Sequence, residues 1–169
     1  MQISMFTMSV EAFLPTLRAL SKLLDKGAQH ATARKFDASV LANGRLAPDM
    51  FPLVKQVQIA CDFAKNSSAR LCGQDPPRFE DNEQTLDELK ARVARTIDYV
   101  QGLRADAFKG SEDRDIKIPL PNNNSLEMKG LQYLNNFALP NFYFHVVAAY
   151  AILRHNGVDV GKRDFLNAL

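Results

Sequence analysis

The chain has 169 residues, of which 46% are hydrophobic, and a formal net charge of +2 from 21 Lys and Arg against 19 Asp and Glu. This length predicts one domain over residues 1–169 and argues against a two-domain enzyme, because single domains cluster at roughly 100–200 residues. No run of basic residues is longer than two. Nucleic acid is therefore not an expected partner, because phosphate binding needs a concentrated basic face.

The cysteines and the N-terminus indicate a cytoplasmic protein. Cys61 and Cys72 lie eleven residues apart in one expected helix, which separates them by about 16 Å, whereas a disulfide spans ~4.4–6.8 Å between Cα atoms. Unpaired cysteines suit a reducing compartment. The first residues lack the basic start and long apolar core of a signal peptide, and the longest apolar candidate, 137–153, falls short of the ~20 residues of a membrane span. We expect no membrane partner.

An amphipathic helix is predicted over Ser9–Ala33, because apolar residues recur there at intervals of three and four. Pro15 lies inside this pattern and has no N–H to donate, so the helix should bend there or begin close to it. A short helix over Ala38–Ala42 should follow, with Asp37 as its cap and Asn43-Gly44 at its end.

The second long helix is predicted from an N-cap at Asp49, with Pro52 in the first turn, to about Cys72, with Gly73 directly after it. It is apolar on more than one face, which places it inside a bundle. The acidic segment Gln74–Gln84 that follows is read as an exposed, solvated loop.

The third helix should begin at Thr85, because Thr85 and Glu88 form the S/T-x-x-E capping box, and should continue to Leu103. Apolar residues then alternate with polar ones between Asp115 and Lys129, which predicts a β-hairpin packed over the bundle, with a polar turn at Pro121–Asn124.

A short helical piece, Leu131–Phe137, should lead to a fourth helix that starts at Pro140 and stops at Asn156-Gly157. The tail 158–169 should pack through Phe165 and Leu166. These elements predict an all-α four-helix bundle with a small β-hairpin before the last helix. The chain contains no G-x-G-x-x-G, P-loop, G-x-S-x-G or H-E-x-x-H motif, which disfavours nucleotide-binding and acyl-transfer enzymes.

His145 is the residue best suited to a chemical role. Its helical phase matches Phe142 and Ile152, so the imidazole should face the interior. It is either a core histidine bonded to another side chain or a metal ligand or pocket base. His155, by contrast, lies in a last helical turn, where a partly cationic imidazole meets the negative end of the helix dipole.

Gln56 and Asn141 are the expected polar neighbours of His145. The neighbours of Gln56 along its helix are Ile59 and Phe63, so its amide should also point inward. The three residues could form a polar, ligand-binding cluster inside an apolar bundle. A second set of polar residues on the same helix is interpreted as a solvent-exposed face. The set comprises Gln58, Asp62, Lys65 and Asn66.

Three stretches carry a family resemblance: residues 140–158, from Pro140-Asn141-Phe142 to Asn156-Gly157-Val158, residues 45–53, from Arg45-Leu46-Ala47-Pro48 to Pro52-Leu53, and the pair Gln56-Val57. They resemble an uncharacterised bacterial family of the DinB-like superfamily, and the likeness covers nearly the whole chain. It implies a four-helix bundle, frequent homodimers, and often a divalent metal, such as zinc or nickel, held by three histidines.

Within that resemblance, His145 matches the third metal-ligand position, because Leu153-Arg154 and Gly157 follow it at the family's intervals. Asn141 stands where the family has its second histidine, and Gln56 is the candidate for the position on the second helix. We therefore expect a degenerate metal site.

Two functions follow from these residues. One is a small-ligand-binding or structural homodimer, in which the three side chains form a satisfied polar core. The alternative, implied by the resemblance, is a divalent-metal-dependent thiol transferase. The missing histidines favour the first.

Overall fold

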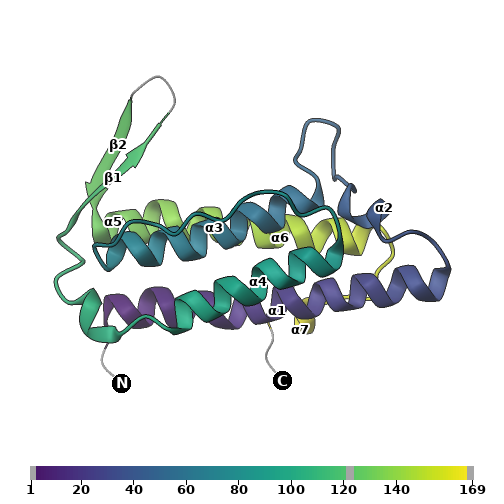
Figure 1. Cartoon of the computed structure of the whole chain (residues 1–169), viewed down its shortest axis with the longest axis horizontal. Helices are drawn as coiled ribbons and strands as arrows, with labels where there is room; N and C mark the ends of the chain where they lie inside the picture. The colour runs from purple at the N-terminus through teal and green to yellow at the C-terminus, as the bar shows by residue number, and fades with distance from the viewer. Residues whose placement is uncertain (1–2, 121–123, 167–169) are drawn as a thin grey trace.

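The structure, a computed structural model, describes residues 3–120 and 124–166. Four long helices lie side by side: α1 (Met5–Arg34), α3 (Leu53–Leu71), α4 (Leu86–Gln101) and α6 (Leu139–His155). Helices α1 and α6 run in one direction and α3 and α4 in the other, because the connection between α3 and α4 returns along the bundle (Figure 1). The all-α bundle with a hairpin before its last helix is confirmed.

Helix α1 begins four residues before the predicted Ser9. Ser4 caps it, since the Ser4 hydroxyl accepts from the N–H of Thr7 at 3.2 Å and the Thr7 hydroxyl accepts from the Ser4 N–H at 2.9 Å. The helix continues through Pro15 to Arg34. The short α2 (Ser39–Ala42) follows. Its N-cap is Ala38 and not the predicted Asp37, although the Asp37 carboxylate accepts from the N–H of Ser39, the first residue of the helix.

The predicted N-cap of the next helix, Asp49, is wrong. Pro52, with extended backbone angles, is the N-cap of α3, and Leu53 is its first residue. The N–H of Leu53 donates to the carbonyl of Gly44 at 2.9 Å, so the start of α3 is tied to the end of the α2 turn. The end of α3 is as predicted, with Gly73 left-handed at φ 71° just after the C-cap.

Helix α4 begins at the predicted capping box. Thr85 Oγ1 accepts from the N–H of Glu88 at 3.2 Å, and the Glu88 carboxylate accepts from the N–H of Thr85 at 2.9 Å. The helix ends at Gln101, and a short 3₁₀ turn, η1 (Ala105–Phe108), leads toward the hairpin.

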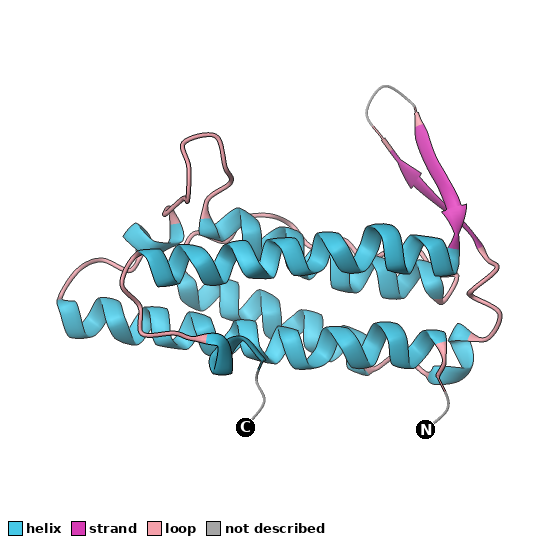
Figure 2. Cartoon of the chain, turned by 180° about the vertical axis from the view of Figure 1, so that it is seen from behind, coloured by secondary structure: helices cyan, strands magenta, loops and turns pink. Residues whose placement is uncertain are grey.

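The hairpin consists of β1 (Asp115–Pro119) and β2 (Ser125–Lys129), paired antiparallel with Ile116 opposite Met128. Ile116 and Ile118 are buried and alternate with exposed residues, as the period of two predicted. The hairpin stands at the end of the bundle where α3 finishes (Figures 1 and 2). Its predicted turn at Pro121–Asn124 lies largely outside the described residues.

The last part of the bundle differs from the sequence prediction at Pro140. One continuous helical stretch runs from α5 (Gly130–Tyr133) through a π-helical segment, η3 (Leu134–Ala138), into α6. Pro140 therefore lies just after the π segment and does not start a separate helix. A proline ring clashes with the carbonyl four residues earlier in an α-helix, and the wider π turn before Pro140 accommodates it.

This continuity makes Gly130–His155 long and apolar enough to cross a membrane by length and composition alone, with a mean hydropathy of 1.2 over 18 residues. The apolar run that begins at Phe137 in the sequence is too short to span a membrane, and the observed helix is longer because it already begins at Gly130. In the fold, the buried side of α6 packs against α3 and α1.

The tail packs through one of its two predicted residues. In α7 (Lys162–Leu166), Phe165 meets Tyr150 edge-on at 5.9 Å between ring centroids, whereas Leu166 is 49% exposed. The core between the long helices is filled by leucines and aromatic rings, among them Phe13 and Phe142, whose centroids lie 4.9 Å apart. The α7 segment lies beside α1, where Lys26 pairs with Asp164 at 2.7 Å.

Candidate functional site

His145 lies on the side of α6 that faces α3, and only 9% of it is exposed. The Phe63 ring lies nearly parallel to the imidazole, with 6.1 Å between centroids, and the Phe144 ring meets it edge-on at 5.2 Å. The inward orientation predicted from the helical phase is confirmed, and the imidazole is placed between two aromatic rings.

Gln56 is the hydrogen-bond partner of His145, as predicted. Nδ1 of His145 lies 2.7 Å from Oε1 of Gln56, and Nε2 of Gln56 donates to the carbonyl of Phe51 at 3.1 Å. A carbonyl can only accept, so the amide nitrogen must face Phe51 and the amide oxygen must face the imidazole. Nδ1 therefore carries the proton, and Nε2 is left with a lone pair.

That lone pair is the reactive feature of the site. Nε2 has no hydrogen-bond partner within residues 3–120 and 124–166. Burial lowers the pKa of His145. The imidazole is thus neutral near pH 7, and Nε2 can accept a hydrogen bond or a proton from a bound molecule.

Asn141, the third predicted member, has a different partner. Its Nδ2 donates to the carbonyl of Phe137, four residues earlier, at 2.7 Å. Phe137 belongs to the π segment, so this bond ties the Asn141 side chain to the backbone of that segment. Asn141 lies one turn before His145 on α6, but no hydrogen bond joins the two side chains.

These residues do not fit a divalent metal. A site for zinc or nickel needs about three strong donors, and amide oxygens are weak ligands for both ions. Here the Gln56 oxygen is already bonded to His145, and Asn141 turns its nitrogen toward the backbone. In the described part of the chain, no group of three His, Cys, Asp or Glu side chains could hold a metal ion.

The structure also shows a buried ionic cluster that the sequence analysis missed. Arg92 of α4 has a fully buried side chain and binds three carboxylates. Nη2 lies 2.8 Å from Asp62 and 2.9 Å from Asp81, and Nη1 lies 3.1 Å from Glu83. We call Arg92 and these three carboxylates the Arg92 cluster.

The Arg92 cluster corrects two sequence interpretations. Gln58 and Lys65, expected on a solvated face, are only 4% and 3% exposed; Gln58 donates to Glu83 at 3.0 Å, and Lys65 lies 3.1 Å from Asp62. The segment 74–84, expected as a freely solvated loop, is fastened to the bundle through Asp81 and Glu83.

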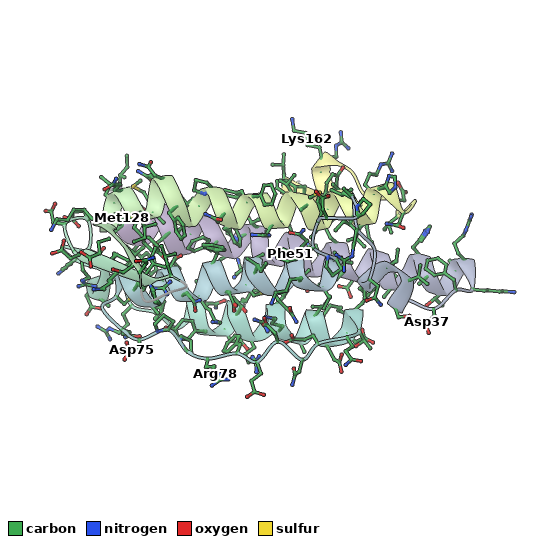
Figure 3. All side chains as sticks on the ribbon, turned by 90° about the horizontal axis from the view of Figure 1, so that it is seen from above. Asp37, Phe51, Asp75, Arg78, Met128 and Lys162 are labelled. Atoms are coloured by element: carbon green, nitrogen blue, oxygen red, sulfur yellow. The ribbon has the colours of Figure 1, made fainter. Side chains whose placement is uncertain are left out.

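Figure 3 shows Asp75 and Arg78 along the edge of the bundle, where this segment returns beside α3 and α4. The segment is fastened by an aromatic side chain as well. The ring of Phe79 lies under the Arg95 guanidinium at 3.8 Å and the Lys65 ammonium at 5.0 Å. A sequence signal for the cluster existed, since Arg92 falls in phase with Leu89 and Thr96 on the buried stripe of α4.

One hollow, of about 590 Å³, lies away from His145. It is found where α1 begins, between Met5, Met8 and Phe108. Its lining contains no histidine or cysteine, and its acidic side chains are Asp106 and Glu112, the first of which is paired with Arg104. We therefore locate the candidate site by the chemistry of His145 and not by cavity size.

Comparison of the chain with known proteins gives three results. Residues 5–166 match a family described as "Domain of unknown function (DUF1993)". Among solved structures, the chain is similar to a DinB family member protein from Shewanella denitrificans, with 42% identity, a TM-score of 0.89, and 97% of this chain and 92% of the other covered. No curated protein matches the chain in sequence.

Proposed function

The chain belongs to the DUF1993 family and has a DinB-like fold, and on this premise we propose that it is a homodimeric small-ligand-binding protein of the cytoplasm. His145 is the polar anchor for the ligand. The observation that carries the proposal is the chain of bonds from Phe51 through Gln56 to His145, which leaves the Nε2 lone pair without a partner in the described structure.

The surroundings of Nε2 define the ligand class. Phe63 and Phe144 flank the imidazole, so the ligand has a flat apolar body and one hydrogen-bond donor that meets Nε2. The site is a degenerate form of the metal site implied by the superfamily, because one histidine is present where three are expected. We do not assign the thiol transferase activity, since the donor set does not fit its metal.

The outer face of α6 supports the homodimer. Tyr143, Phe144 and Val147 are 37%, 58% and 48% exposed and lie within about one turn of each other. Only 39% of the most apolar 18-residue window of Gly130–His155 is buried. A two-fold axis beside α6 would set this face against the same face of a second copy. Phe144 also touches His145, so the ligand site would border the interface.

The cysteines support the proposed location in the cytoplasm. Cys61 and Cys72 are both free thiols, and burial raises the pKa of the Cys61 thiol to about 12. The buried Cys61 is inert, whereas Cys72 is only partly buried, so a reducing compartment would keep Cys72 from pairing with other thiols.

The ligand site is tested with phenol and indole as probes, by following the His145 side-chain ¹⁵N resonances during titration. We expect a saturable shift of the Nε2 resonance in the wild type. His145→Phe, which keeps an aromatic ring without the lone pair, should lose binding of both probes. Absence of any saturable shift, or unchanged binding by His145→Phe, would contradict the proposed site.

The dimer is tested by light scattering on separated peaks. The wild type should have about twice the chain mass of 18.9 kDa, and Val147→Lys should yield monomers because it buries a charge in the interface. Glu11→Lys, an exposed position on α1, is the matched control and should stay dimeric. A monomeric wild type at micromolar concentration refutes the dimer, and capture of the wild type by lipid vesicles would assign the α6 face to a membrane instead.

A further inference from the structure

We propose that a second hollow, between α3, β1 and the π segment, binds a small organic carboxylate, with Arg70 as the residue that recognises the anion. The hollow has a volume of about 180 Å³ and is lined by Asp62, Phe63, Asn66, Arg70, Ile118 and Phe137. It is distinct from the His145 site, although Phe63 forms a wall of both.

Arg70 is held in place by the buried hydroxyl of Tyr133, which is itself bonded to Ser67. Its Nη1 donates to the hydroxyl oxygen of Tyr133 at 3.2 Å, and that hydroxyl lies 3.0 Å from Oγ of Ser67. Tyr133 and Ser67 are both fully buried. The guanidinium is therefore oriented before any ligand arrives, which reduces the entropy lost on binding.

Arg70 lacks an acidic partner in the described structure. None of the ion pairs within residues 3–120 and 124–166 includes it. Its side chain is half-buried, so solvent screens the charge only in part. A half-buried guanidinium with free N–H donors suits a carboxylate, which it can bind with two parallel hydrogen bonds.

Asn66 adds a second donor on the same side of α3. It lies four residues before Arg70, so the two side chains are neighbours on the helix surface. The oxygen of the Asn66 amide accepts from Nζ of Lys65 at 2.6 Å. This bond fixes the orientation of the amide and leaves its NH₂ group available to a carboxylate oxygen.

Asp62 also lines the hollow, but its charge does not oppose this assignment. Its Oδ1 is paired with Nη2 of Arg92 at 2.8 Å and with Nζ of Lys65 at 3.1 Å. It lies eight residues before Arg70, or about 12 Å along the helix. The negative charge is thus compensated and is at the other end of the hollow.

The remaining walls of the hollow favour an apolar ring as the part of the ligand next to the carboxylate. Phe63, Phe137 and Ile118 are apolar, and the rings of Phe63 and Phe137 meet with centroids 5.7 Å apart. A cavity of about 150 Å³ is known to hold benzene, so a ring of that size fits here. An apolar body joined to one planar anion, as in benzoate, uses every group in the hollow, whereas inorganic phosphate would leave the apolar walls unused.

The test titrates the 169-residue chain with benzoate, benzyl alcohol and inorganic phosphate, and binding is followed by calorimetry and by the NMR resonances of the Phe137 ring. Benzoate should bind saturably, and Arg70→Gln should weaken its binding at least roughly tenfold, the factor expected for loss of a charge-assisted hydrogen bond. Benzyl alcohol should bind weakly to both proteins. The matched control Arg78→Gln, at an exposed arginine on the 74–84 segment (Figure 3), should bind benzoate like the wild type.

Other outcomes decide against the proposal. Absence of saturable benzoate binding, or equal binding by the wild type and Arg70→Gln, overturns it. Phosphate binding as tight as that of benzoate overturns the ligand class. If Arg70→Gln does not fold, Asn66→Ala is measured instead and should weaken benzoate binding several-fold; unchanged binding also overturns the proposal. His145→Phe should leave benzoate binding intact, which separates failure of this site from failure of the proposed function.

Discussion

Replacing Arg92 with methionine tests whether the Arg92 cluster fastens the 74–84 segment to the bundle. Methionine keeps much of the apolar stem and removes only the guanidinium. Three carboxylates, from Asp62, Asp81 and Glu83, then lose their shared cation. We expect a marked loss of stability, because a carboxylate that stays buried without a cation is costly.

The magnitude follows from what each carboxylate retains. Asp62 and Asp81 are 32% and 34% exposed and keep Lys65 and Lys55 as partners. Glu83 is only 7% exposed and keeps no cation, although Gln58 still donates to it. The loss should therefore lie near the lower end of the range for breaking a buried ion pair, about 3 kcal/mol. This corresponds to a Tm lower by roughly 6–12 °C.

The assay is thermal and urea unfolding, followed by circular dichroism at neutral pH. Arg95→Met is the matched control: it lies three residues further along α4, is exposed, and stacks on Phe79, so it should lose no more than about 1 kcal/mol. Adding Glu83→Gln to Arg92→Met should restore part of the stability. A loss below about 1 kcal/mol for Arg92→Met, or strict additivity in the double variant, would refute this reasoning.

Three further predictions concern other parts of the chain. Gly130→Ala should lower the free energy of unfolding by about 1–3 kcal/mol, because a Cβ at this position would lie 1.8 Å from the Ser111 carbonyl oxygen. The control Gly161→Ala has open space around its Cβ and should be neutral or slightly stabilising in the same thermal melt. Thr85→Ala should cost about 1 kcal/mol, since it removes the hydroxyl that caps α4; urea unfolding measures this, and an unchanged midpoint would count against the cap. Burial lowers the pKa of His145, so the unfolded chain takes up the proton first as pH falls below about 6.5. Wild-type stability should therefore decrease from that pH downward, and His145→Gln should flatten the decrease; identical pH profiles would contradict it.

Local signals in the sequence predicted the elements whose cause is also local. The capping box at Thr85 and the glycine after α3 satisfy backbone groups within one turn, so they can be read without knowledge of the fold. The pairing of Gln56 with His145 was also predictable, because each side chain lies on the buried stripe of its own helix. The bond between them then follows from the need to satisfy buried polar groups.

The errors came from interactions that depend on distant segments. Asp62 and Lys65 resemble an ordinary exposed helix pair, and only the return of the 74–84 segment beside α3 and α4 makes them part of a buried cluster. Arg92 was in phase with the buried stripe, but its phase alone does not say which acids will reach it. Pro140 was read as a helix start, because sequence rules do not anticipate a π turn before a proline.

The π segment constrains how this chain can change in length during evolution. A π turn, with its i→i+5 hydrogen bonds, holds one residue more than an α-helical turn. Removing one exposed residue of this segment, such as Asn136, would therefore convert it to ordinary α-helix. Each α-helical residue turns the chain by about 100°, so the eleven steps then left between Tyr133 and His145, both of them buried, would bring the two to nearly the same face. A single-residue gap at Leu134–Ala138 should therefore be tolerated better than a gap elsewhere between Tyr133 and His145.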